Sequence, residues 1–201
     1  MKKILLAIPT SCFVESETVK SLYNMQIPDG YEATLEIVKG YAVHQARNIL
    51  VDLAIKGGFD YVFWIDADVI LPDYILSVLL NTGKDIVCGY YHKKIENQEV
   101  AEIFGKCPDG SLSNVLARDL PKQPGVYQIG ACGFGCTLTS VEVFKKMLEN
   151  SDTDDLCFDY IYKKNAMCSE DILFCQRAEA LGYITYVHTG MRCGHIGQRV
   201  F

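Results

Sequence analysis

The architecture can be read from Tyr61-Val62-Phe63-Trp64-Ile65-Asp66-Ala67-Asp68-Val69. Its first five residues are apolar or aromatic, which is typical of a buried strand, and an Asp-x-Asp pair ends the run. Two carboxylates are costly to keep dry unless positive charge lies beside them. In open α/β sheets, ligands bind at the carboxyl ends of the strands. Hard oxygen ligands suit Mg²⁺ or Mn²⁺, so the stretch predicts a divalent metal that presents a diphosphate.

A second Asp-x-Asp triplet, Asp152-Thr153-Asp154, provides a comparison within the same chain. No apolar run precedes it, and Asp155 follows, so we interpret it as a solvated acidic loop. The two triplets have the same pattern. Only the strand in front of Asp66 indicates a ligand site.

The composition indicates one globular domain, residues 1–201, with 49% hydrophobic and 22% charged residues. The net charge of −6 weighs against a nucleic-acid partner. No apolar run approaches the ~18 residues of a membrane span. The first residues carry two lysines and an apolar patch, but the patch stops at Pro9, so it predicts a first strand and not a signal peptide.

The nine cysteines are scattered and include no Cys-x-x-Cys pair, which excludes the zinc-ribbon pattern. Several lie within apolar segments, as Cys88 does, and are interpreted as small buried hydrophobic residues. The odd count argues against a complete set of internal disulfides. These features predict a cytoplasmic protein.

Strand and helix patterns alternate through the first ninety residues. Apolar runs and period-two alternation predict strands at 3–8, 31–38, 61–65 and 85–91. Helical spacing predicts helices at 17–25, 41–56 and 72–80. Such alternation indicates an α/β fold with a mostly parallel central sheet flanked by helices.

The second half of the chain follows a different pattern. Residues 100–127 are polar and carry a Pro-Asp-Gly turn, which predicts a small antiparallel insertion. A strand is expected at 128–138, followed by a helix that a Thr139/Glu142 capping box opens. Ser169 is expected to cap a helix at 170–181, and a last strand is expected at 183–187.

Several side chains outside the Asp-x-Asp pair have both a structural and a functional interpretation. Arg47 lies beside the apolar stripe of its helix, either as a surface residue or as a partner of a phosphate or a carboxylate. Glu170 and Asp171 either complement a helix dipole or supply a general base. His195, between two glycines, is either a neutral tail residue or a metal ligand.

The glycine-rich segment 130–135 reads Gly-x-x-Gly-x-Gly, the wrong order and place for a dinucleotide fingerprint. Its glycines are expected either to let the backbone approach a substrate or to pack a tight strand. The chain contains no P-loop pattern and no Gly-x-Ser-x-Gly elbow, which excludes those two chemistries.

Taken in order, these segments resemble glycosyltransferases of the GT-A fold, in the family-2-like group. The resemblance covers nearly the whole chain and rests on Ile8-Pro9-Thr10, Ala46-Arg47-Asn48, the strand ending at Asp68, the segment 130–135, Ser169-Glu170-Asp171 and Cys193-Gly194-His195-Ile196-Gly197. It implies a nucleotide-binding half at 1–95 and an acceptor and catalytic half at 96–201. The implied reaction moves a sugar from a nucleoside diphosphate donor, expected to be a UDP-sugar, to an acceptor hydroxyl with inversion.

The resemblance also implies a role for each matching residue. Pro9 and Thr10 would hold the nucleotide base, and Arg47 would hold the nucleotide or its diphosphate. Asp68 and His195 would bind Mn²⁺ or Mg²⁺, and Asp66 would contact the ribose or a metal-bound water. Asp171 would be the base, with Glu170 beside it. Ala67, Gly133 and Phe134 would complete the donor site.

Two other functions stay open at this point. A nucleotidyltransferase would use a similar sheet and metal, but it would carry glycine and Arg or Lys directly after the first strand, where this chain has Ser11-Cys12-Phe13-Val14-Glu15. A domain that binds nucleotide sugar or carbohydrate without turnover is the second. The chain is short for the group, so little of it is left to form a binding region for the acceptor. The acceptor is expected to be a glycan, a protein or another compound with a hydroxyl group. Phe158, Tyr160 and Tyr162 are expected either to stack on a sugar or to pack in the core.

Overall fold

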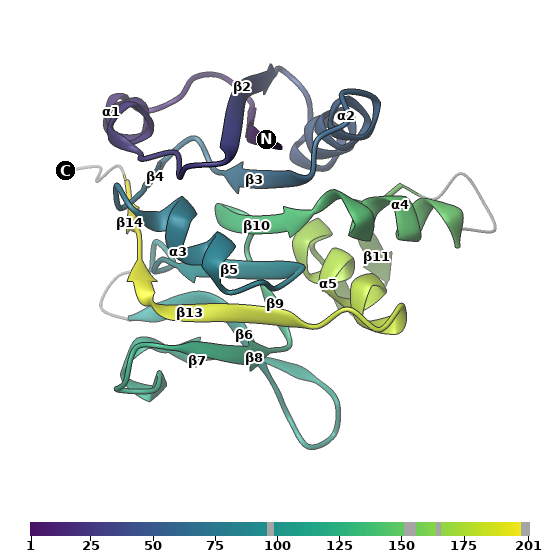
Figure 1. Cartoon of the computed structure of the whole chain (residues 1–201). Coiled ribbons are helices and arrows are strands. Elements are labelled where there is room, and N and C mark those ends of the chain that lie inside the picture. Colours follow the sequence, from purple (N-terminus) through teal and green to yellow (C-terminus); the bar gives the residue numbers. More distant parts are fainter. Residues whose placement is uncertain (96–98, 151–155, 164–165, 198–201) are drawn as a thin grey trace.

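The computed structural model describes residues 1–95, 99–150, 156–163 and 166–197. The acidic triplet at 152–154 lies outside these ranges. A seven-stranded sheet in the order β2-β1-β3-β10-β5-β13-β8 forms the centre of the molecule (Figure 1). Its strands are β1 (Lys2–Thr10), β2 (Tyr31–Lys39), β3 (Tyr61–Ile65), β5 (Ile86–Tyr90), β8 (Val126–Ile129), β10 (Cys136–Ser140) and β13 (Thr185–Arg192).

Most strands of this sheet run in one direction. β1 pairs in parallel with both β2 and β3, and β13 pairs in parallel with β5. β10 runs antiparallel between β3 and β5, and β8 runs antiparallel along β13. The predicted α/β class with a mostly parallel sheet is therefore confirmed.

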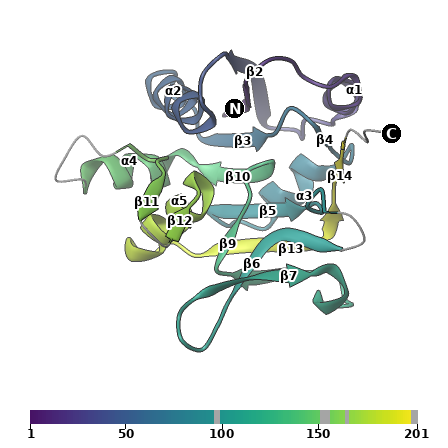
Figure 2. The same cartoon turned by 180° about the vertical axis from the view of Figure 1, so that it is seen from behind.

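Two groups of helices cover the two faces of the sheet. Along β1, Leu5 and Ala7 join a core with α2 (Val43–Lys56), α4 (Val141–Glu149) and α5 (Glu170–Ala180). Ile4 and Ile8 face the opposite core with α1 (Ser16–Asn24) and α3 (Ile75–Asn81). Figures 1 and 2 show α1 and α3 together on one side and α2, α4 and α5 on the other. The period-two alternation of strand residues produces these two cores.

Smaller antiparallel sheets complete the fold. β6 (Val100–Lys106) pairs with β7 (Leu112–Leu116) and with β9 (Ala131–Cys132), which confirms the predicted antiparallel insertion. β14 (Gly194–His195) pairs with β4 (Val69–Ile70), directly after the Asp-x-Asp pair. β11 (Ile161–Lys163) and β12 (Ala166–Cys168) form a hairpin before α5.

Several boundaries differ from the sequence prediction: the helix expected at 72–80 begins at Ile75, and three further differences lie in the second half of the chain. The strand expected at 128–138 is divided among β8, β9 and β10, which belong to two different sheets. Ser140, not Thr139, caps α4, because Ser140 directly precedes the helix and its hydroxyl accepts from the Glu142 N–H. The last strand is longer than predicted, since β13 continues to Arg192.

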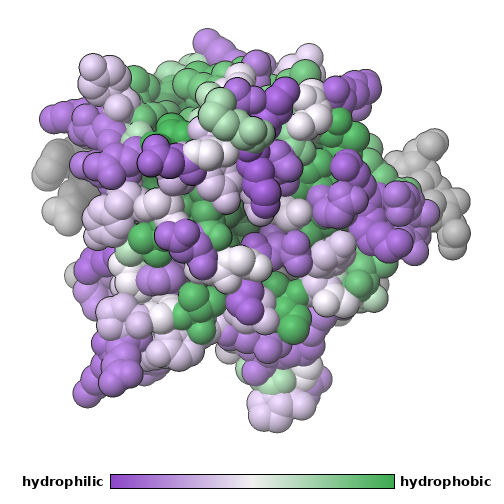
Figure 3. Space-filling view, in the orientation of Figure 1, coloured by the Kyte–Doolittle hydropathy of each residue, from purple (hydrophilic) through white to green (hydrophobic). Residues whose placement is uncertain are grey.

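Each of the nine cysteines lies within the described ranges and is a free thiol. In the part of the chain that the structure describes, no helix has both the length and the apolar character that crossing a membrane requires. Figure 3 shows hydrophilic residues over most of one face, with apolar residues in small groups between them.

Candidate functional site

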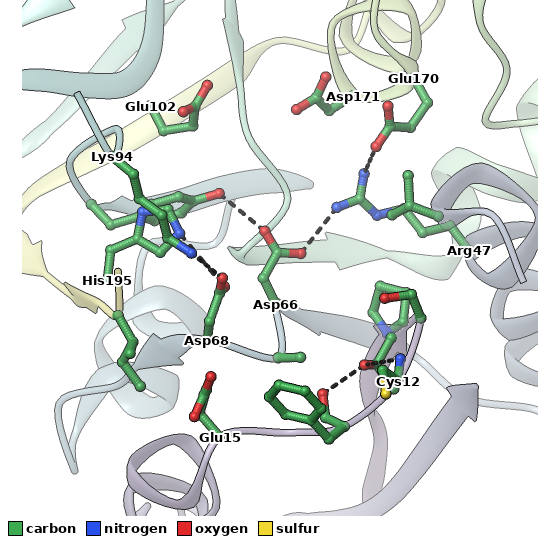
Figure 4. A pocket seen from close by; sticks show the side chains of 18 residues that line it. Cys12, Glu15, Arg47, Asp66, Asp68, Lys94, Glu102, Glu170, Asp171 and His195 are labelled. Carbon is green, nitrogen blue, oxygen red and sulfur yellow. Dashed lines mark hydrogen bonds and ion pairs between the residues drawn. The ribbon is translucent and has the colours of Figure 1, made fainter. Parts of the chain in front are cut away.

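A cavity of about 650 Å³ lies where β1 and β3 end. Nine of the residues predicted for the site line it: Pro9, Thr10, Arg47, Asp66, Ala67, Asp68, Glu170, Asp171 and His195. These residues come from both halves of the chain, and parallel strands bring them to one edge of the sheet. Figure 4 shows the labelled acidic side chains around one space.

Asp66 is the first carboxylate after β3 and lies deep in the cavity. Its Oδ1 accepts from Arg47 Nη2 at 3.2 Å, and its Oδ2 accepts from the Tyr91 hydroxyl at 3.4 Å. Burial raises the pKa of Asp66, and Arg47 opposes this shift. The Asp66 side chain keeps 30% of its surface accessible, so it still faces the cavity.

Arg47 is buried, not at the rim of its helix as the sequence suggested. It is 2% exposed, because the aromatic rings of Phe134 and Phe158 cover the guanidinium at 5.4 and 5.6 Å. Its Nη1 donates to Glu170 Oε1 at 2.6 Å and its Nη2 donates to Asp66. Burial acts to lower the pKa of Arg47, but Asp66 and Glu170 raise it overall, so the charge is retained.

Asp68 and His195 meet at the junction of β4 and β14. His195 Nε2 lies 3.5 Å from Asp68 Oδ1, and the Ile196 N–H donates to the Asp68 carbonyl. The other ring nitrogen, Nδ1, lies 2.7 Å from the His92 carbonyl oxygen and donates to it. With a proton on Nε2 the ring donates toward Asp68; without it, the Nε2 lone pair is free for a metal, and the Nδ1–H bond to a carbonyl is the outer contact that metal-binding histidines commonly make.

The two Asp68 oxygens have different partners. Oδ2 pairs with the Lys94 ammonium, and Oδ1 faces His195. Burial would raise the pKa of Asp68, but the His195 and Lys94 contacts lower it to about 2. Asp68 is therefore a carboxylate at neutral pH.

Glu170 and Asp171 begin helix α5, as predicted, but their side chains diverge. Glu170 is 6% exposed and paired with Arg47. The Ser169 hydroxyl donates to Asp171 Oδ1 and makes no capping bond to the helix backbone, and the Ile172 N–H donates to the same oxygen at 2.8 Å. Both residues line the cavity, but Arg47 holds Glu170, so Asp171 is the carboxylate of the two that is available to a ligand.

Gly133 and Phe134 were predicted for the site, but among the described residues they do not line the cavity. They lie behind the residues that do. Phe134 is 1% exposed and packs edge-on to Phe174 at 4.9 Å. A Cβ on Gly133 would lie 2.6 Å from Tyr91 Oη. A Cβ on Gly135 would lie 2.6 Å from Tyr91 Oη and 2.7 Å from Asp66 Oδ2. These glycines therefore let the backbone approach the side chains that support the site.

The three aromatic residues before α5 separate into core and surface. Phe158 is fully buried and stacks on Phe174 at 4.8 Å, so it belongs to the core. Tyr160 stacks on Tyr162 at 5.9 Å, and Tyr162 is 74% exposed. Burial raises the pKa of Tyr160, and Glu170 beside it raises it further.

Several residues that line the cavity were not predicted from the sequence, and three of them, Tyr91, Lys94 and Glu102, contact or neighbour the predicted carboxylates. Tyr91 is 3% exposed and accepts from the Gly135 N–H at 3.0 Å. Burial raises the pKa of Glu102, which pairs with Lys93 at 3.2 Å. The only signal in the sequence was the polar segment that follows β5. Its composition does not indicate which of its side chains face the cavity.

Acidic groups dominate the cavity wall. Among the charged residues that line it, six are acidic and two basic, and Arg47 is held by two of the acidic ones. An anionic ligand would therefore need a cation with it. Within the described ranges, no three His, Cys, Asp or Glu side chains converge to hold an ion by themselves. Asp68 and His195 fit Mg²⁺ or Mn²⁺ as a partial ligand set, because such ions keep several waters and bind substrate phosphates.

Comparison with known proteins bears on the fold. No protein-family model matches the chain, and no curated protein matches its sequence. A crystal structure of A197 from STIV has a TM-score of 0.61 and 19% identity, over 98% of this chain and 87% of that one. A crystal structure of GalNAc-T7 with UDP, GalNAc and Mn²⁺ has a TM-score of 0.61 and 12% identity, over 98% of this chain and 44% of that one. This chain thus has a GT-A-like fold and spans less than half of GalNAc-T7.

Proposed function

We propose that this chain is a metal-dependent glycosyltransferase of the family-2-like group. It moves a sugar from a nucleoside diphosphate donor, a UDP-sugar, to the hydroxyl of an acceptor. The observation that carries the proposal is the convergence of Asp68, His195 and Asp171 on one cavity at the end of β3. The fold shared with GalNAc-T7, whose structure holds UDP and Mn²⁺, supports it.

Asp68 and His195 would hold Mn²⁺ or Mg²⁺, with Asp66 contacting a metal-bound water or the ribose. When bound, such an ion neutralises the charge that develops on the departing diphosphate. The Asp68 carboxylate is ionised, and the His92 carbonyl orients the His195 ring. Asp68 would therefore bind a cation without losing a proton at neutral pH. Burial lowers the pKa of His195 but the Asp68 contact raises it, so a protonated His195 would have to release its Nε2 proton first.

The donor would lie along the edge formed by β1 and β3, in the half of the chain at 1–95. Pro9 and Thr10 border the place proposed for the base, where the Thr10 hydroxyl donates to the Phe13 carbonyl and fixes the loop. Ala67, with no bulk beyond its Cβ, leaves room beside the ribose and diphosphate. Arg47 would act on the donor mainly through Asp66, since both of its terminal nitrogens are paired.

Asp171 would act as the general base from the half at 96–201. The acceptor oxygen attacks the anomeric carbon, and the acceptor proton passes to Asp171. The bond from that carbon to the phosphate oxygen breaks, and its electron pair stays with the diphosphate. Attack opposite the leaving group inverts the anomeric carbon. Ser169 holds Asp171 Oδ1, which leaves Oδ2 for the proton.

Thermal melting with nucleotides and nucleotide sugars, each with and without Mn²⁺, tests the proposal. A ligand that binds only the folded chain raises the melting temperature. We expect a Mn²⁺-dependent rise with UDP or a UDP-sugar that is lost in Asp68→Ala. The control is Asp73→Ala, which removes an exposed aspartate that does not line the cavity.

The same experiment separates the alternatives. A rise with a nucleoside triphosphate alone would favour a nucleotidyltransferase, although the loop before Glu15 offers no basic side chain for it. A rise that is independent of both Mn²⁺ and Asp68 would favour a binding domain without turnover. No rise with any nucleotide would overturn the donor site.

A further inference from the structure

The Lys94 ammonium contacts Asp68, the carboxylate that the proposed function gives to the cation. The ammonium pairs with Oδ2, and His195 Nε2 faces Oδ1, so both oxygens of the carboxylate already have partners. Figure 4 shows the Lys94 and His195 nitrogens side by side above Asp68. A divalent ion cannot take both protein ligands without meeting the Lys94 charge.

Lys94 differs from the other basic residue of the cavity wall in its freedom to move. The Arg47 side chain is 3% exposed and bridges two carboxylates, whereas the Lys94 side chain is 42% exposed and contacts one. Breaking a buried, doubly paired arginine contact is costly, while an exposed lysine pair exchanges with water at little cost. Lys94 is thus the basic group of this wall that can change partners.

We propose that Lys94 competes with the divalent cation for Asp68 in the free protein and transfers to a phosphate oxygen of the donor once the cation is bound. The inference rests on the proposed function, since it requires a cation at Asp68 and a diphosphate on that cation. It adds a residue to the donor site and a reason for ordered binding. The cation frees Lys94 from Asp68, so that Lys94 can bind the donor phosphate. The donor phosphate in turn keeps Lys94 from competing with the cation for Asp68.

Charge makes the transfer favourable. With the cation on Asp68, the lysine ammonium is left beside a like charge and without its carboxylate. A phosphate oxygen bound to that cation lies within a few ångströms of Asp68, inside the range that the lysine already spans. Lysine binds phosphate as a compact point charge, and the six acidic residues of the wall leave the donor few other cationic partners.

The test measures binding in the full chain and requires no turnover. Mn²⁺ is titrated into wild type and Lys94→Met without nucleotide, and free Mn²⁺ is followed by electron paramagnetic resonance. UDP is then titrated by calorimetry at saturating Mn²⁺. We expect Lys94→Met to bind Mn²⁺ roughly three- to fivefold more tightly, the change that matches loss of an exposed ion pair, and to bind UDP more weakly by a similar factor.

Lys93→Met is the matched control. It removes the same charge one position away, but the Lys93 ammonium lies 3.2 Å from Glu102 and over the Phe104 ring, not against Asp68. We expect it to change both affinities by less than about twofold, because the Lys93 ammonium pairs with Glu102 and has no contact with Asp68. Lys94→Arg keeps the charge and should retain the competition.

Opposite shifts of Mn²⁺ and UDP affinity in Lys94→Met alone would support the proposal. Equal Mn²⁺ affinity in Lys94→Met and wild type, with binding still lost in Asp68→Ala, would overturn it and leave the proposed metal site intact. Equal changes of Mn²⁺ and UDP affinity in Lys93→Met and Lys94→Met would also overturn it. Loss of one positive charge near the cavity, and not loss of the Asp68 contact, would then explain the changes. Mn²⁺ binding that ignores Asp68 in every variant would overturn the proposed function as well.

Discussion

Arg47 and Glu170 form a buried ion pair, with 2.6 Å between Nη1 and Oε1, across 123 positions of the sequence. Their side chains are 3% and 7% exposed. The pair joins α2 to the first residue of α5, and the second terminal nitrogen of Arg47 reaches Asp66. The carboxylate that ends β3 and the helix that carries Asp171 are therefore held in one frame.

Replacing Arg47 with methionine should destabilise the chain by about 3–5 kcal/mol, because Glu170 is left buried without its partner. The double variant Arg47→Met/Glu170→Gln should recover much of this loss, since it removes the unpaired charge. Urea denaturation of the single and double variants measures both effects.

The control for Arg47 is Lys106→Met, which breaks the half-exposed pair with Glu179. An exposed pair contributes only ~0–1 kcal/mol, so this variant should resemble wild type. Similar losses in Arg47→Met and Lys106→Met would contradict the structural role given to Arg47.

Gly135→Ala should distort the floor of the cavity. The added methyl would lie 2.6 Å from Tyr91 Oη and 2.7 Å from Asp66 Oδ2, closer than van der Waals contact allows. We expect a loss of about 1–3 kcal/mol in unfolding free energy, together with weaker UDP binding. Gly105→Ala is the control, because its nearest neighbour is Val115 Cγ2 at an ordinary 3.6 Å. Equal effects of the two substitutions would argue against the tight contact.

The assignment of the base can be tested between two carboxylates of the cavity. Asp171→Asn should lower turnover about 10²–10⁴-fold, with UDP affinity in Mn²⁺ unchanged, because a general base contributes about that much. Glu102→Gln should lower it far less. Release of UDP from the sugar donor measures both. If Glu102→Gln carried the larger loss, Glu102 would be the base.

Stability should depend on pH through Glu102. Burial raises the pKa of Glu102 in the folded chain above its ordinary value of 4.5, and Lys93 opposes this only in part. The folded state then binds more protons than the unfolded state, so the contribution of Glu102 falls as pH rises through and above 4.5. Glu102→Gln should lack this fall. The measurement is the melting temperature of wild type and Glu102→Gln from pH 4 to neutrality, with a chelator present. Parallel curves of melting temperature against pH for the two proteins would contradict this prediction.

The succession of strands and helices in the first half, and the place of the Asp-x-Asp pair after β3, were predictable from local pattern. Period-two and helical spacing are properties of neighbouring residues, so they identified β3 and α2 without tertiary contacts. The same logic failed at 128–138, because one apolar run with glycines does not reveal that it is shared between two sheets.

The pairings inside the site depend on the packing of distant segments. Local spacing placed Arg47 at a helix rim, but Phe134 and Phe158 enclose it and leave it to Glu170. Lys94 reaches Asp68 because the chain after β5 forms part of the cavity wall. The spacing of apolar residues and the local composition indicate which residues face a core. They do not indicate which charged groups form pairs across more than a hundred positions of the sequence, because those pairs depend on how the helices pack on the sheet.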